Sequence, residues 1–140
     1  MDILRDNLIK AKKTLKFNNK NKKDIDGTDP VTELFLDVIK KYKVLTHLHK
    51  DYHAMLLIQL ARVFGLDIIA THCMDIYRKS VFSFLNMDNI PMIYGLLDCF
   101  PYKVELKHES WQNVKSLVDS GAKFALMSDH PVIPKRNTFY

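Results

Sequence analysis

Histidine side chains that could bind a metal ion are concentrated in the segment THLHKDYH (46–53). In a β-strand, His47 and His49 would face the same side, so this pair could reach one ion. In a helix, His49 and His53 stand four residues apart and would share one face instead. A histidine here can also be a hydrogen-bonded loop residue that binds no ligand, so these residues alone leave the alternatives open.

Further polar side chains stand at or just past the ends of short apolar runs. His72, Asp98 and Asp129 occupy such positions, as His47 does. Two imidazoles and a carboxylate from separate strand ends are typical of a hydrolytic metal site. Cys73 could be a thiol ligand or nucleophile, although a small buried residue is the simpler interpretation. The sequence therefore offers a metal-dependent hydrolase as one hypothesis.

Short β-rich runs alternate with helical patterns from residue 43 onward. We expect strands over residues 43–47, 67–72, 90–95 and 122–129, and helices over residues 31–41, 55–65, 76–86 and 109–120. An amphipathic helix is expected earlier, over residues 2–16. The Asn- and Lys-rich segment 17–29 predicts a loop, and Asp29-Pro30 is a helix-start signal.

Apolar strands that alternate with helices predict βαβ units and a parallel sheet buried on both faces. The expected fold class is therefore α/β, and four strand–helix units make half of a (β/α)8 barrel. Active sites in parallel α/β folds are built at the C-terminal ends of the strands. The predicted sheet would bring the polar residues to that edge, and half a barrel would leave two open edges.

Composition and charge narrow the classes of partner. The 140 residues are 47% hydrophobic and 26% charged, an ordinary globular composition. The net charge of +5 arises in residues 1–50, whose lysines lack the arginine cluster and interleaved aromatic residues of a nucleic-acid site. No charge-free stretch approaches the roughly 18 residues of a membrane span. With two cysteines and no secretory signal, we expect a cytoplasmic protein without nucleic-acid or membrane partners.

Several motifs together resemble a known family. They are THLHK (46–50), ATHC (70–73), the IPMIYGLL…KVEL segment (90–106) and SGAKFALMSDHPVIP (120–134). They resemble the C-terminal half of the amidohydrolase superfamily, in particular the imidazolonepropionase-like members, whose barrel ends in a similar GVKxALxTDHPVIP. The opening LRDNLIKAKKTL also resembles the helix before strand five of those proteins. The resemblance covers nearly the whole chain.

The resemblance implies a distorted (β/α)8 barrel that binds one or two divalent metals. His47 matches the ligand on strand five, His72 the ligand on strand six and Asp129 the ligand on strand eight. The ligands that the superfamily places on strands one and four have no counterpart in this chain. The expected metal is zinc, with iron or manganese as alternatives.

The implied activity is hydrolysis of a non-peptide C–N bond, in an amide or an imide. Asp129 would take the proton of the attacking water and pass it to the leaving nitrogen. We expect His49, His130 and Glu105 to bind the substrate, a small molecule. Glu105 belongs to the segment KVELKHES, which could instead be a solvated loop. The family's acidic HAHRADD turn reads HLHKDYH here (47–53), so the substrate stays open.

The expected organisation is an N-terminal helix with a flexible Lys/Asn-rich loop over residues 1–29, then a half-barrel over residues 30–140. The alternative to a hydrolase is a catalytically inactive fragment. Because of the open sheet edges, we expect a homo-oligomer or a complex with a separate N-terminal half.

Overall fold

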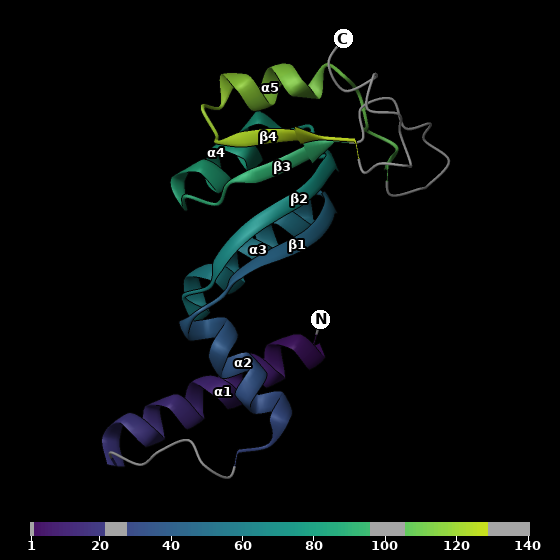
Figure 1. Ribbon diagram of the computed structural model, residues 1–140. Coiled ribbons are helices and arrows are strands. Elements are labelled where there is room, and N and C mark those ends of the chain that lie inside the picture. The colour runs from purple at the N-terminus through teal and green to yellow at the C-terminus, as the bar shows by residue number, and fades with distance from the viewer. Residues whose placement is uncertain (1, 22–27, 96–105, 129–140) are drawn as a thin grey trace. The chain divides into compact units, whose positions relative to one another are not determined.

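The computed structural model describes residues 2–21, 28–95 and 106–128, and the chain forms two compact units (Figure 1). One unit comprises residues 1–44 and 60–67, and the other comprises residues 45–59 and 68–140. Asp98, Glu105, Asp129 and His130 lie outside the described residues. The predictions that concern these four side chains therefore stay predictions.

The first unit is built around two helices, α1 (Asp2–Asn21) and α2 (Pro30–Lys40), which pack through buried side chains such as Leu8 and Leu36. Helix α1 continues five residues past the predicted end at residue 16, because residues 17–21 contain neither proline nor glycine. The predicted loop over residues 17–29 is therefore wrong for its first part.

The predicted start of α2 is confirmed by its cap. Asp29 accepts hydrogen bonds from the backbone N–H and the hydroxyl of Thr32, at 3.0 and 2.7 Å, and pairs with Lys10 Nζ at 2.8 Å. Lys10 and then Thr32 lower the pKa of the Asp29 carboxyl far below its ordinary value.

The second unit contains a four-stranded sheet in the order β1-β2-β3-β4, with bounds β1 (Lys43–Lys50), β2 (Asp67–Asp75), β3 (Met92–Gly95) and β4 (Phe124–Met127). Strands β2, β3 and β4 pair in parallel, with Ala70 opposite Met92 and Met92 opposite Phe124. The predicted α/β class is thus confirmed, and the strands direct their C-terminal ends to the same edge (Figure 1). We call this the C-terminal edge.

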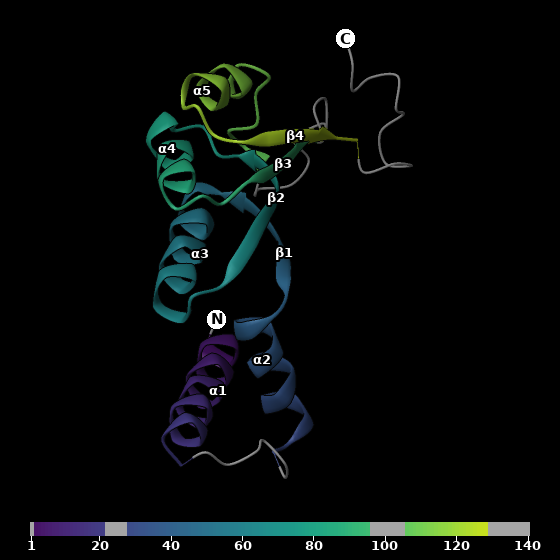
Figure 2. The same ribbon diagram turned by 60° about the vertical axis from the view of Figure 1, so that its left-hand side comes forward.

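Helices α4 (Lys79–Met87) and α5 (Asn113–Asp119), with the first turns of α3 (Asp51–Phe64), cover one face of the sheet (Figure 2). The core between them contains Ile58, Ala70, Phe82, Leu85, Met92, Tyr94 and Leu117. On the other face, Leu45 is 63% exposed and Ile93 is half-buried. The sequence predicted a sheet buried on both faces. Within the described residues only the face under the helices is buried, since no second layer lies against the opposite face.

Element boundaries differ from the predictions mainly at the C-terminal edge. Strand β1 continues to Lys50 and α3 begins at Asp51, where the sequence predicted a strand end at 47 and a helix start at 55. His47 and His49 therefore share a strand, and the alternative of a helix face common to His49 and His53 is wrong. No helix within the described ranges is long and apolar enough to cross a membrane.

One glycine is required by the close approach of two strands. Gly95, at the end of β3, has a φ of 154°, and a Cβ built there would lie 2.0 Å from the carbonyl oxygen of Met127 in β4. Any side chain would therefore push β4 away from β3.

Candidate functional site

Three imidazoles meet at the C-terminal edge, where β1 and β2 end. His47 and His49 alternate along β1, and their Nε2 atoms lie 2.9 Å apart. The ring of His72, from β2, lies with its centroid 4.0 Å from that of His47 and 5.4 Å from that of His49. We call His47, His49 and His72 the histidine cluster. Two of the predicted metal ligands, His47 and His72, are therefore neighbours.

An unusual backbone directs His72 into this cluster. Ala70 is buried toward the helices, so the alternation of a regular strand would direct residue 72 to that same side. His72 and Cys73 instead have positive φ values of 70° and 58°, which cost energy in residues other than glycine. This break in the pleat accompanies the contact of the His72 ring with His47 on the neighbouring strand.

Cys73 is a small buried residue. It is 0% exposed, and burial raises the pKa of its thiol well above the ordinary value. The thiol is therefore protonated near neutral pH, which argues against a thiolate ligand or nucleophile.

The histidine cluster has the donor type of a metal site, but its three imidazoles do not form a group that could hold a metal ion. Neutral imidazole nitrogen is a common ligand of zinc and of iron. Two nitrogens bound tetrahedrally to one zinc ion lie about 3.3 Å apart. The Nε2 atoms of His47 and His49, of which only His47 is a predicted ligand, lie 2.9 Å apart. Within residues 2–21, 28–95 and 106–128, no group of three or more His, Cys, Asp or Glu side chains could hold a metal ion. Asp129, the third predicted ligand, lies outside these ranges.

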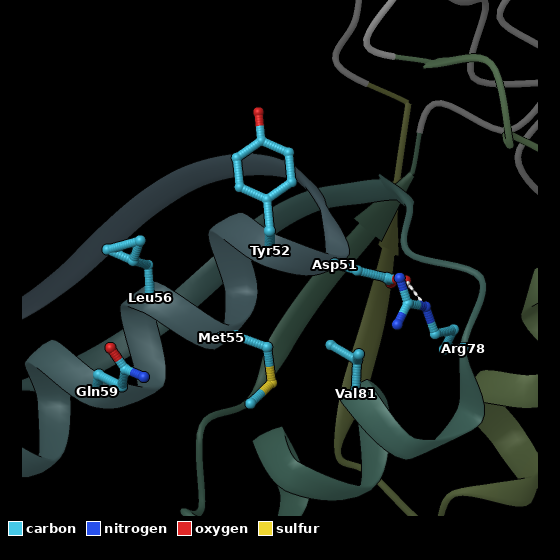
Figure 3. A pocket seen from close by; sticks show the side chains of 7 residues that line it. All are labelled: Asp51, Tyr52, Met55, Leu56, Gln59, Arg78 and Val81. Carbon is cyan, nitrogen blue, oxygen red and sulfur yellow. Dashed lines mark ion pairs between the residues drawn. The ribbon is translucent and has the colours of Figure 1, made fainter.

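A hollow of about 230 Å³ lies between the start of α3 and α4 (Figure 3). At one end Arg78 Nε pairs with Asp51 Oδ2 at 2.8 Å, and Met55 and Val81 line the middle. The Asp51 side chain is only 9% exposed, and burial raises the pKa of its carboxyl although the Arg78 guanidinium opposes the shift. Sequence reasoning missed this ion pair, which joins the first residue of α3 to the N-cap residue of α4.

A second polar group at the C-terminal edge connects the end of β2 to the loop before α5. Asp75, 2% exposed, accepts hydrogen bonds from the backbone N–H of His108 at 2.5 Å and from its Nδ1 at 3.3 Å. The carbonyl oxygen of His108 accepts a hydrogen bond from the side chain of buried Asn113 at 2.8 Å. The His108 ring also stacks on Tyr77, with centroids 4.4 Å apart. We call Asp75, His108 and Asn113 the acid–histidine network.

Sequence reasoning missed this network as well. The one available signal was an aspartate inside the apolar run ATHCMDI (70–76), because a carboxylate is rarely buried without a partner. The partner could not be found from the sequence, since it lies 33 residues away.

Comparison with known proteins supports the predicted resemblance. No family model matches the sequence, and no curated protein matches it. The fold matches a solved structure described as an amidohydrolase from Thermotoga maritima MSB8, with a TM-score of 0.79 and 30% sequence identity. The match covers 95% of this chain and 35% of that one, so this chain spans about a third of the structure it resembles. The resemblance to an amidohydrolase, over part of its length, is thereby confirmed.

Proposed function

We propose that this chain supplies the C-terminal part of a metal-dependent hydrolase that acts on non-peptide C–N bonds, in amides or imides. The observation that carries the proposal is the position of His47 and His72. Their rings lie 4.0 Å apart at the C-terminal edge of a fold that resembles an amidohydrolase. This edge is where parallel α/β enzymes place their catalytic groups.

In this proposal, His47, His72 and Asp129 would hold the divalent metal, with zinc favoured and iron or manganese as alternatives. When bound, such a metal polarises the substrate carbonyl and lowers the pKa of a bound water. Asp129 accepts the proton of the attacking water and returns it to the leaving nitrogen. His49, His130 and Glu105 bind the small-molecule substrate.

The proposal includes a partner for the four-stranded sheet, whose edge strands are β1 and β4. Both edge strands expose apolar side chains, Leu45 on β1 and Leu126 on β4, at 63% and 40%. We propose that a second copy of the chain, or a separate N-terminal half, covers these edges. The second candidate function is an inactive subunit of such an assembly. A cytoplasmic location fits the buried free thiol of Cys73.

Zinc binding and hydrolysis, measured together, test the proposal. We expect calorimetry to detect one zinc ion per chain and amide or imide hydrolysis that is lost with a chelator and restored by zinc. Hydrolysis by the chain alone, or only after an N-terminal half is added, would support the enzyme. Zinc binding without hydrolysis in either form would favour the inactive subunit, and the absence of both would overturn the proposal.

Light scattering tests the proposed partner. An exposed apolar edge in a parallel sheet should associate, so we expect dimers or larger species at micromolar concentration. A sharp monomer mass with cooperative melting would contradict the expectation that the chain needs a partner.

A further inference from the structure

His108 has the surroundings of an oriented acid–base group. Its Nδ1 and its backbone N–H both contact the carboxylate of Asp75, which is 2% exposed. A buried carboxylate accepts hydrogen bonds, so its contact with Nδ1 favours the tautomer in which Nδ1 carries the proton. The Nε2 atom is then the basic nitrogen, and the His108 side chain is 40% exposed. The ring therefore carries its basic nitrogen on a side chain that solvent reaches in part.

Three contacts hold the imidazole in place. Asp75 fixes one ring nitrogen, Asn113 fixes the backbone through the carbonyl oxygen, and the Tyr77 ring stacks on the imidazole at 30° between planes. A base whose orientation is fixed by a buried carboxylate is the arrangement that activates imidazoles in hydrolases on unrelated folds.

The network lies at the same end of the sheet as the histidine cluster. Asp75 follows His72 by three residues in β2, so their Cα atoms are at most about 11 Å apart at 3.8 Å per residue. His108 belongs to the segment that follows β3, and such segments emerge at the C-terminal edge of a parallel sheet.

We propose that His108 is a proton-transfer residue of the hydrolase and that Asp75 is its positioning residue. This inference rests on the proposed function and refines its second proton transfer. As the C–N bond breaks, its electron pair goes to the nitrogen, which takes the proton from Nε2 of the His108 imidazolium. Asp75 stabilises that imidazolium, and the neutral imidazole then regains a proton from solvent. This route replaces the return of the proton by Asp129 in the proposed function: Asp129 keeps the first transfer and releases that proton to solvent.

Asp75→Asn provides the sharpest variant. The asparagine oxygen can still accept from the His108 backbone, while its NH2 donates toward Nδ1 and reverses the tautomer. In the serine hydrolases this reversal keeps the geometry and abolishes most of the activity. Asp119→Asn, in the exposed ion pair of α5 with Lys115, is the matched control.

Two readouts do not depend on the metal or on hydrolysis, and both are made with a chelator present. Nitrogen NMR should show the proton on Nδ1 of His108 in the parent and on Nε2 in Asp75→Asn. Diethyl pyrocarbonate, which acylates unprotonated imidazole, should modify His108 at least about tenfold more slowly in Asp75→Asn, mapped by mass spectrometry. Equal tautomers, or equal acylation in the parent and in Asp75→Asn, would overturn the assignment of Asp75.

Hydrolysis then tests the role of His108. In His108→Gln the backbone contacts with Asp75 and Asn113 remain, so the fold should persist. We expect kcat to fall by about 10²–10⁴-fold and the pH dependence of kcat to change, with little effect on KM. Unchanged turnover in His108→Gln would overturn the proposal. If the parent hydrolyses nothing, the proposed function fails, while the tautomer and acylation results still decide the pairing of Asp75 with His108.

Discussion

The two histidine-containing groups at the C-terminal edge are held in opposite ways. In the histidine cluster, imidazoles from β1 and β2 contact one another, and His47 is exposed. In the acid–histidine network, the single imidazole of His108 is fixed by a buried carboxylate and by its own backbone. A metal ion can draw imidazoles together by small ring rotations, whereas a proton-transfer base must be oriented in advance. The two arrangements thus suit two different tasks.

The largest expected effect concerns Asp129, which would complete the histidine cluster. Asparagine forms the turn before His-Pro about as well as aspartate but cannot take a proton from water. In any form that hydrolyses substrate, Asp129→Asn should lower turnover by about 10²–10⁴-fold while the melting temperature barely moves. Turnover within about twofold of the parent would exclude Asp129 as the base. It would also weaken the assignment of the histidine cluster to a hydrolytic metal site.

A second prediction asks whether the histidine cluster binds metal. His47→Ala and His72→Ala should each weaken zinc binding at least about tenfold, since even residues behind the ligands are worth about 10–100-fold. His53→Ala is the control, because that ring lies in α3 against Tyr52, with centroids 4.1 Å apart. Calorimetric titration of the three variants decides the matter. Parent-like zinc affinity in both His47→Ala and His72→Ala would remove the cluster from the metal site.

A third prediction concerns the network as a structural element. Asp75→Ala leaves the backbone N–H of His108 without its buried acceptor, which should cost about 1–3 kcal/mol of unfolding free energy. The exposed Asp119→Ala should cost less than about 1 kcal/mol. Denaturant unfolding of both variants measures the difference. Equal losses would mean that the network adds no rigidity, and the contrast with the histidine cluster would disappear.

The smallest effect concerns Asp51, the buried carboxylate at the start of α3. Burial raises the pKa of the Asp51 carboxyl above its pKa in the unfolded chain. The carboxyl therefore contributes fully to the free energy of unfolding below the pKa of the unfolded chain, and this contribution is lost as pH rises through the pKa of the folded chain. The free energy of unfolding of Asp51→Asn should therefore compare most favourably with that of the parent near neutral pH. This advantage of the variant should disappear toward pH 3. Chemical unfolding at several pH values measures this trend, and an opposite slope would contradict the effect of burial.

The strands and their parallel class were predictable because apolar runs such as DIIATH report burial locally. The pairing of His47 with His49 was one of two local alternatives, and the continuation of β1 to Lys50 decided it. Asp75 and His108 were out of reach, because their contact joins residues far apart in the chain. The left-handed backbone at His72 was also hidden, since histidine gives no conformational signal of the kind that glycine does.

That left-handed pair restricts the residues that fit well at positions 72 and 73. In a library selected only for folding, glycine should be enriched at both positions, because it adopts positive φ at little cost, and β-branched residues should be depleted. In a library selected for zinc binding, only histidine should survive at position 72, while position 73 should keep the preference of the folding selection. Selection for stability and selection for function would therefore diverge at one residue and agree at the next.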